Sequence, residues 1–193
     1  SIVGFAVSRA LAGRRNPGLL AERARMLRQE EAKAWDRTLA PMMALGSGLL
    51  PLVAGFDALF DGLPAFGLGL ELAALAIFVG GYALGTYALI ENRFFSGMVR
   101  IQRERGHQVV SSDPYRWVRH PGYVGALLSY WATPLLLESL WALVPALLLT
   151  GVVVLRTALE DAGIRYEVRV MSAHRDPELV REYCHNARMR GLK

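Results

Sequence analysis

Residues 64–90, PAFGLGLELAALAIFVGGYALGTYALI, form an apolar run in which Glu71 is the single charged residue. A membrane-spanning helix needs about 20 predominantly apolar residues, so this run is long enough to cross a bilayer. Glycine and alanine are frequent in it, as in helices that pack closely within a membrane. The run therefore predicts a membrane-spanning helix and an all-α fold.

The distribution of charge around this run supports a polytopic membrane protein. All 22 Lys and Arg lie in residues 9–37, 93–119 and 156–193, and none lies in 38–92 or 120–155. The chain is nevertheless 53% hydrophobic with a net charge of +5. Basic loops on one side of the membrane produce this segregation and favour contact with anionic lipid headgroups. Nucleic acid is not an expected partner, because the basic residues are not interleaved with aromatic ones on one platform.

We expect an all-α membrane helix bundle with about four spans and the tail of an earlier one. That tail is the apolar stretch SIVGFAVSRALA at the start of the sequence. The last two spans are short and are joined by LLESLW, which predicts a hairpin. The four expected spans are residues 38–60, 64–90, 121–137 and 139–156.

The links between the spans predict the orientation of the bundle. The links near Asp57, Asp61 and Glu138 carry no basic residue and are expected to face outward. The basic segments 13–37, 91–120 and 156–193 are expected to face the cytoplasm. Residues 18–34 predict an amphipathic surface helix, most simply a solvated linker. Glu71 lies close enough to the outer boundary of its span to reach water, so we assign it no function.

The stretch PYRWVRHPGYVG, residues 114–125, places ionisable groups at the start of the third span. Pro121 occupies the favoured first position of a helix, with His120 at the cap. The free N–H groups of such a first turn suit a carboxylate or a phosphate. Tyr115 and Tyr123 offer aromatic faces to a cation. This stretch predicts a site for a small charged cofactor at the membrane surface.

Arg156 and Glu160 are spaced i, i+4 at the cytoplasmic end of the fourth span and share a helix face. The arginine suits an anionic substrate and the glutamate a cationic cofactor. His120 and Arg156 each have a simpler explanation as well. His120 can be a helix cap that only closes its loop, and Arg156 can be a residue at the membrane boundary whose side chain reaches water. The lone Cys184 has no internal disulfide partner, and no metal-ligand cluster surrounds it.

The segments GHQVV (106–110), PYRWVRHPGYVG and RTALED (156–161) together resemble the isoprenylcysteine carboxyl methyltransferase family, especially its prokaryotic integral-membrane members, and the related phospholipid methyltransferases. NRFFS and VRIQ, within residues 92–102, are similar as well. The resemblance covers about residues 14–161 and implies that the chain binds S-adenosylmethionine. The charge pattern predicts that this site faces the cytoplasm. Gln102 is the nearest match to an upstream glutamine of the family. The cofactor-binding residues that the resemblance implies are Gln102, His107, Gln108, Val109, Val110, Tyr115, His120, Pro121, Gly122, Tyr123 and Glu160.

The resemblance also implies that Arg156 faces the substrate, so we take it as the catalytic and substrate-binding residue. A carboxylate acceptor has a pKa of about 4 and is already ionised at pH 7, so methyl transfer to it needs no general base. The protein then supplies proximity and alignment, and excludes water. The expected partners are the bilayer and a lipophilic or prenylated substrate. The methyl acceptor and the oligomeric state stay open.

Two other functions stay open. An NADPH-dependent membrane reductase of the sterol reductase type would use a related cofactor region, but this chain is short for that class. A catalytically inert membrane protein is the other alternative, because the family pattern stops after Asp161. Cofactor preference separates the first alternative from a methyltransferase, and turnover separates the second.

Residues 162–193 resemble a fragment of the soluble aminoimidazole ribonucleotide carboxylase/mutase, whose Ser-Ala-His-Arg motif matches residues 172–175. We therefore expect a membrane domain at 1–161 and a foreign-looking tail at 162–193. The alternation in IRYEVRVM, residues 164–171, predicts a strand, followed by a helix. Because a lone strand needs a partner edge, helix, disorder and pairing with another copy stay open for the tail. The fragment is too short to carry that enzyme's nucleotide site.

Overall fold

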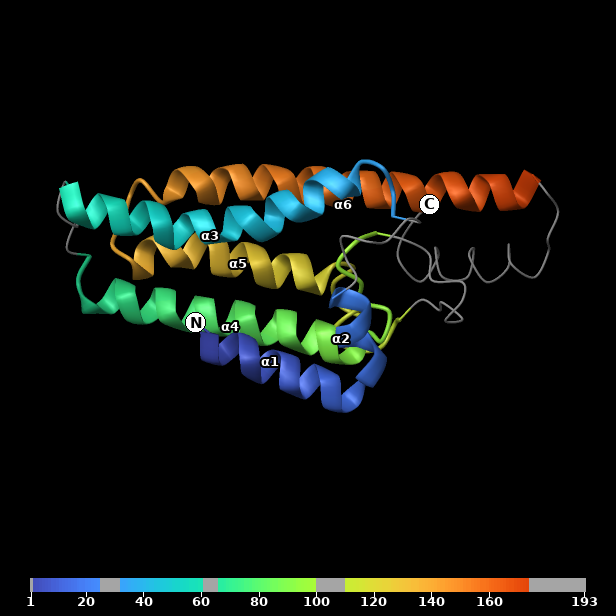
Figure 1. The fold of residues 1–193 in the computed structure, drawn as a ribbon, viewed down its shortest axis with the longest axis horizontal. Helices are drawn as coiled ribbons and strands as arrows, with labels where there is room; N and C mark the ends of the chain where they lie inside the picture. Colours follow the sequence, from blue (N-terminus) through green and yellow to red (C-terminus); the bar gives the residue numbers. More distant parts are fainter. Residues whose placement is uncertain (1, 25–31, 61–65, 100–109, 174–193) are drawn as a thin grey trace. The chain divides into compact units, whose positions relative to one another are not determined.

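The computed structural model describes residues 2–24, 32–60, 66–99 and 110–173. These residues form helices and no strand, which confirms the all-α membrane fold (Figure 1). The chain divides into two compact units, Ser1–Val153 and Val154–Lys193. The first unit contains most of the described residues.

The described helices follow the expected order of the apolar runs. In chain order they are α1 (Ile2–Arg15), α2 (Pro17–Ala24), α3 (Asp36–Phe60), α4 (Leu68–Glu91), α5 (Pro121–Leu136) and α6 (Leu143–Ala173). The helices expected at 38–60 and 64–90 are confirmed as α3 and α4. α4 begins later than expected, after Gly67, whose φ of 53° is unsuited to a helix.

Three segments of the described chain are long and apolar enough to cross a membrane: Asp36–Phe60, Leu68–Glu91 and Leu143–Gly163. α5 is the expected third helix, but its 16 residues extend only about 24 Å at 1.5 Å per residue. That length is short of a hydrocarbon core of about 30 Å. α5 is therefore a helix of the bundle that is shorter than a full span.

The fourth helix differs from its expected bounds at both ends. It begins at Leu143 rather than at 139, because the hairpin between α5 and α6 turns through Glu138, whose φ is 51°. It also runs past 156 to Ala173. The strand expected at 164–171 is wrong, since this segment continues α6 as a helix. Propagating an existing helix adds a hydrogen bond with each residue, whereas a lone strand has no partner edge. Residues 174–193, including the second half of the expected tail, lie outside the described residues.

The expected surface helix at 18–34 is correct only in its first part. α2 covers Pro17–Ala24, and residues 25–31 lie outside the described chain. Residues 32–35 form a turn that leads into α3 rather than a continuation of the helix. In this turn the backbone N–H of Asp36 donates to the carbonyl of Lys33 at 2.9 Å.

Within the first unit, α4 and α5 pack closest, at a pair of glycines. A Cβ added to Gly81 would lie 2.7 Å from the carbonyl oxygen of Gly125 and 2.8 Å from Cβ of Leu128. Such an approach lets two helix backbones come together in a membrane, where packing rather than water drives association. The start of α6 packs on α3 through a small core of Leu50, Ala146 and Leu149.

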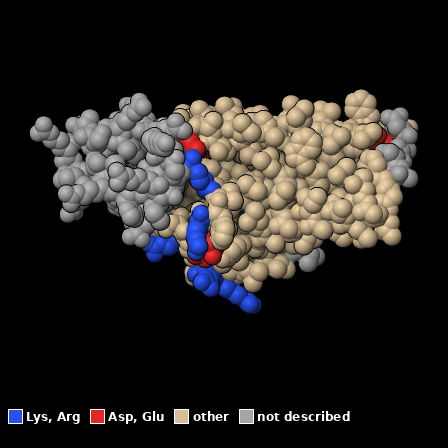
Figure 2. All heavy atoms as spheres, turned by 180° about the vertical axis from the view of Figure 1, so that it is seen from behind, with Lys and Arg blue, Asp and Glu red and all other residues tan. Residues whose placement is uncertain are grey.

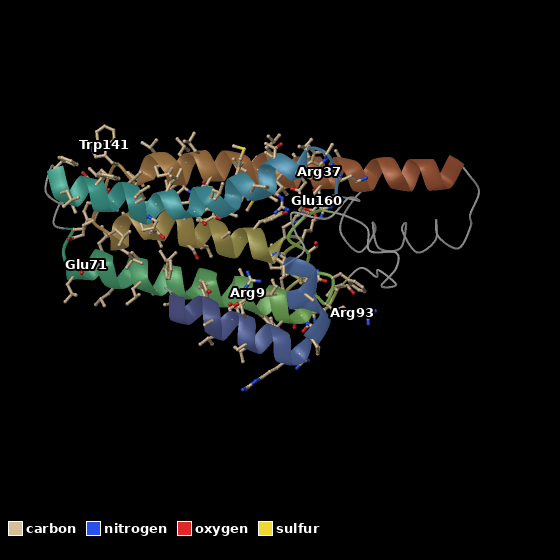
Figure 3. All side chains as sticks on the ribbon, viewed as in Figure 1. Arg9, Arg37, Glu71, Arg93, Trp141 and Glu160 are labelled. Atoms are coloured by element: carbon tan, nitrogen blue, oxygen red, sulfur yellow. The ribbon has the colours of Figure 1, made fainter. Side chains whose placement is uncertain are left out.

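Apolar side chains cover the outside of these helices. Leu45 and Leu59 on α3 are 77% and 76% exposed, as expected for residues that face lipid. The Lys and Arg side chains in Figure 2 gather at one end of this apolar surface. We call this the basic end; it is formed by Arg14 and Arg15 at the end of α1, Arg37 at the start of α3, Arg93 after α4, and Arg116 before α5. Glu71 and Trp141 lie at the opposite end of the unit (Figure 3).

Candidate functional site

The candidate site lies at the basic end, where α4 stops and α5 begins. Segment 92–99 follows α4, and the loop of residues 110–120 precedes α5. The described residues of the first unit that were predicted to bind the cofactor are Val110, Tyr115, His120, Pro121, Gly122 and Tyr123. The predicted residues Gln102, His107, Gln108 and Val109 lie outside the described residues.

α5 begins as the sequence predicts, with His120 at the N-cap and Pro121 at the first helical position. The carbonyl of His120 accepts the N–H groups of Tyr123 at 3.0 Å and Val124 at 3.1 Å. The helix start carries no hydrogen bond from a capping side chain. Since the side chain of the N-cap residue makes no capping hydrogen bond, the positive end of the helix dipole suits a ligand carboxylate.

His120 and Tyr123 stack on each other at this helix start. Their ring centroids are 5.4 Å apart and the ring planes are inclined by 17°. Both residues are partly exposed. One face of the Tyr123 ring thus lies against the imidazole, and the stack joins the cap residue to the first turn of α5.

Tyr115 uses its hydroxyl within the protein. The O–H of Tyr115 donates to the carbonyl oxygen of Ala88 at 3.2 Å. The hydroxyl oxygen of Tyr115 in turn accepts a hydrogen bond from Asn92 Nδ2 at 3.3 Å. Ala88 belongs to the last turn of α4 and is fully buried. The loop before α5 is therefore tied to the end of α4 through the tyrosine hydroxyl, and the ring of Tyr115 is the part suited to a ligand.

Gly122 lies close to the ring of Phe95. A Cβ at this position would lie 2.8 Å from Cζ and 2.9 Å from Cε2 of Phe95. Phe95 itself packs against the core cluster of Ala12, Leu19 and Leu89. The absence of a side chain at Gly122 lets segment 92–99 approach the first turn of α5.

Segment 92–99 is also attached to the start of α3. The N–H of Val99 donates to the carboxylate of Asp36, which is fully buried. The N–H of Lys33 donates to the carbonyl of Val99 at 3.2 Å. Met98 forms a buried cluster with Ala32 and Ala40. The backbone N–H and carbonyl of Val99 are thus held by the first residue of α3 and by the turn before it.

The loop before α5 also carries an aromatic anchor. The indole of Trp117 is 75% exposed, donates to Asp113 Oδ1 at 2.8 Å, and lies 5.3 Å from the Arg116 guanidinium carbon. Ser112 Oγ donates to Glu91 Oε1 at 2.6 Å. Exposed tryptophan beside arginine is typical of the boundary between membrane and water. The site is therefore expected at the depth of the lipid headgroups.

Arg156 and Glu160 belong to the second unit. They lie one turn apart on α6, as their spacing predicts. Arg156 is 7% exposed, whereas Glu160 is partly exposed. Among the described residues, no group of three or more His, Cys, Asp or Glu could hold a metal ion.

Residues 73–165 match the model of the isoprenylcysteine carboxyl methyltransferase (ICMT) family. Over these residues the chain is similar to the ICMT family. The matched range includes every predicted site residue, and it confirms the family that the motifs at 106–125 and 156–161 indicated. No curated protein and no solved structure matches the chain. The match, together with three apolar helices long enough to span, indicates a membrane methyltransferase.

Sequence reasoning did not assign roles to Asn92 and Phe95. Both fall in NRFFS, which indicated only family similarity. One signal was available: asparagine is favoured just past the end of a helix, and Asn92 directly follows α4. The contacts of these residues with Tyr115 and Gly122 depend on tertiary structure.

Proposed function

We propose that the chain is an S-adenosylmethionine-dependent methyltransferase of the membrane. It acts on a carboxylate or another nucleophile of a lipid-like substrate, and an isoprenylcysteine is the first acceptor to test. The single observation that carries the proposal is the ICMT family match over residues 73–165. The geometry at the start of α5 supports it.

The residues present suit S-adenosylmethionine chemically. The helix start at Pro121 has no capping hydrogen bond from the N-cap side chain and suits a carboxylate. The aromatic rings of Tyr115 and Tyr123 suit a sulfonium cation. From the family resemblance, we assign Glu160 to the cofactor as well. When bound, this cofactor supplies an electrophilic methyl group for in-line displacement.

The protein's own residues then have limited tasks. An acceptor carboxylate is ionised at neutral pH, so no side chain has to remove a proton. Arg156 is proposed to orient the acceptor anion, since its guanidinium can bind a carboxylate through two parallel hydrogen bonds. The remaining residues align the reactants and keep water from the methyl group, and alignment alone can lower a barrier substantially.

We also propose that the basic end faces the cytoplasm, as the positive-inside rule indicates. The methyltransferase-like domain is proposed to end near residue 161, close to the end of the family match at residue 165. The cofactor would then be taken from the cytoplasm, while an acceptor with a long apolar tail would arrive within the bilayer.

The test is calorimetric titration of the detergent-solubilised protein with S-adenosylmethionine and, separately, with NADPH. We expect saturable binding of S-adenosylmethionine that is weakened by His120→Ala and by Glu160→Ala. Leu148→Ala, at a position 65% exposed on the apolar surface, is the control and should bind as the unmodified protein does. Binding of NADPH alone would favour the reductase, and binding of neither would refute a functional cofactor site.

A further inference from the structure

Asn92 makes three hydrogen bonds at the point where α4 ends. Its backbone N–H donates to the Ala88 carbonyl at 3.1 Å. Its side-chain Oδ1 accepts the N–H of Phe94 at 2.9 Å, which shapes the turn after the helix. Its Nδ2 donates to the Tyr115 hydroxyl oxygen at 3.3 Å, across 23 positions of sequence. The first two bonds are local, and the third reaches the candidate site.

These contacts form a closed set of hydrogen bonds. The Ala88 carbonyl accepts from both Asn92 N–H and Tyr115 O–H, and the Asn92 amide donates to the same hydroxyl. Along the chain from the Asn92 amide to the Tyr115 hydroxyl to the Ala88 carbonyl, accepting one hydrogen bond polarises the hydroxyl and strengthens the bond that it donates. Because the hydroxyl has its only proton on Ala88, it can accept but not donate to Asn92. The amide donor of Asn92 is therefore the group that completes the set.

We propose that Asn92 is a positioning residue for the methyltransferase site, acting through Tyr115. It fixes the hydroxyl end of Tyr115 against α4 and so sets the position of the aromatic ring. The inference rests on the proposed function, in which that ring lies against the cofactor. It assigns a role to a residue that does not itself contact the reacting atoms.

The Asn92→Asp variant separates this role from simple capping of α4. An aspartate keeps an oxygen to accept the Phe94 N–H but has no amide to donate to Tyr115. Tyr115→Phe is the complementary variant, since it keeps the ring and removes the hydroxyl. If Asn92 acts through that hydroxyl, the two changes are not additive when combined.

The matched control is Asn16→Asp. Asn16 also donates its Nδ2 to the end of α4, at the Ile90 carbonyl and a distance of 2.7 Å, but it makes no hydrogen bond to Tyr115. This control measures the effect of loosening the end of α4 alone. It should lower the thermal unfolding midpoint while leaving cofactor affinity unchanged.

The experiment measures the Kd for S-adenosylmethionine and the unfolding midpoint of the full chain in detergent, for all four variants. Loss of one hydrogen bond predicts that Asn92→Asp raises Kd about two- to tenfold. In the Tyr115→Phe background the same change should raise Kd by less than about twofold. Equal effects in both backgrounds, or no effect in either, would overturn the positioning role. If the unmodified protein does not bind S-adenosylmethionine, the proposed function fails first and the positioning role with it.

Discussion

The Ser139 hydroxyl donates a 2.6 Å hydrogen bond to Oδ2 of Asp57, joining buried residues 82 positions apart. Ser139 lies in the hairpin between α5 and α6, and Asp57 lies in the last turns of α3. Ser139 Oγ also accepts the N–H of Ala142 at 3.2 Å, where α6 is about to begin. This pair holds the end of the bundle opposite the basic end.

Ser139→Ala is expected to destabilise the protein without weakening cofactor binding. It removes the hydroxyl donor from the buried Asp57 carboxylate and the acceptor from the Ala142 N–H. An unsatisfied buried polar group costs about 1–3 kcal/mol. Thermal unfolding in detergent measures the effect. Ser47→Ala is the control, because Ser47 is only partly buried and its hydroxyl donates locally, to the Ala44 carbonyl. Equal midpoints for the two variants would contradict the prediction.

Gly122→Ala is expected to weaken binding of S-adenosylmethionine, because the added Cβ would meet the Phe95 ring at 2.8 Å. Either Phe95 or the first turn of α5 must move, and overpacking of this kind typically costs about 1–3 kcal/mol. Combining it with Phe95→Leu, which removes ring atoms, should restore part of the affinity. Gly151→Ala on α6, where a Cβ meets nothing within 4 Å, is the control. A Gly122→Ala protein with unchanged Kd would show that the close approach is dispensable.

Gly81→Ala is expected to disturb the contact between α4 and α5 far more than Gly80→Ala. A Cβ at Gly81 would meet the backbone oxygen of Gly125, which cannot rotate away, whereas a Cβ at Gly80 meets nothing within 4 Å. Gly80→Ala should be neutral or stabilising by up to about 1 kcal/mol, since alanine favours a helix over glycine. Thermal unfolding of the two variants compares neighbouring positions on the same helix. Similar midpoints would argue against this packing in the membrane.

The orientation can be tested with single cysteines in a Cys184→Ser background. Ser111→Cys probes the loop at the basic end, and Leu140→Cys probes the hairpin between α5 and α6; both positions are exposed. A thiol reagent that does not cross membranes should label Leu140→Cys in intact cells. It should label Ser111→Cys only after the membrane is opened. The reverse pattern would show that the basic end faces outward.

The positions of the apolar helices were predictable from composition. Charged side chains are costly in hydrocarbon, so the absence of Lys and Arg from 38–92 and 120–155 marks the membrane region. The start of α5 was equally local information, since Pro121 lacks an N–H and has a φ already suited to a helix. The same reasoning was wrong for residues 164–171, whose alternating pattern resembles a strand. With α6 already formed in front of them, helix extension prevailed over a strand without a partner.

Sequence alone thus determined the membrane class, the order of the helices, the family and the motif at the cap of α5. These properties depend on hydropathy, charge and residues close together in the chain. Tertiary structure decided how Tyr115 is held by Asn92, how closely Gly122 approaches Phe95, and how Ser139 meets Asp57. Each of these contacts joins segments far apart in sequence, and no local periodicity or spacing encodes which side chains meet when helices pack. The physical reason is that such contacts depend on the packed positions of two backbones, which exist only once the bundle has formed.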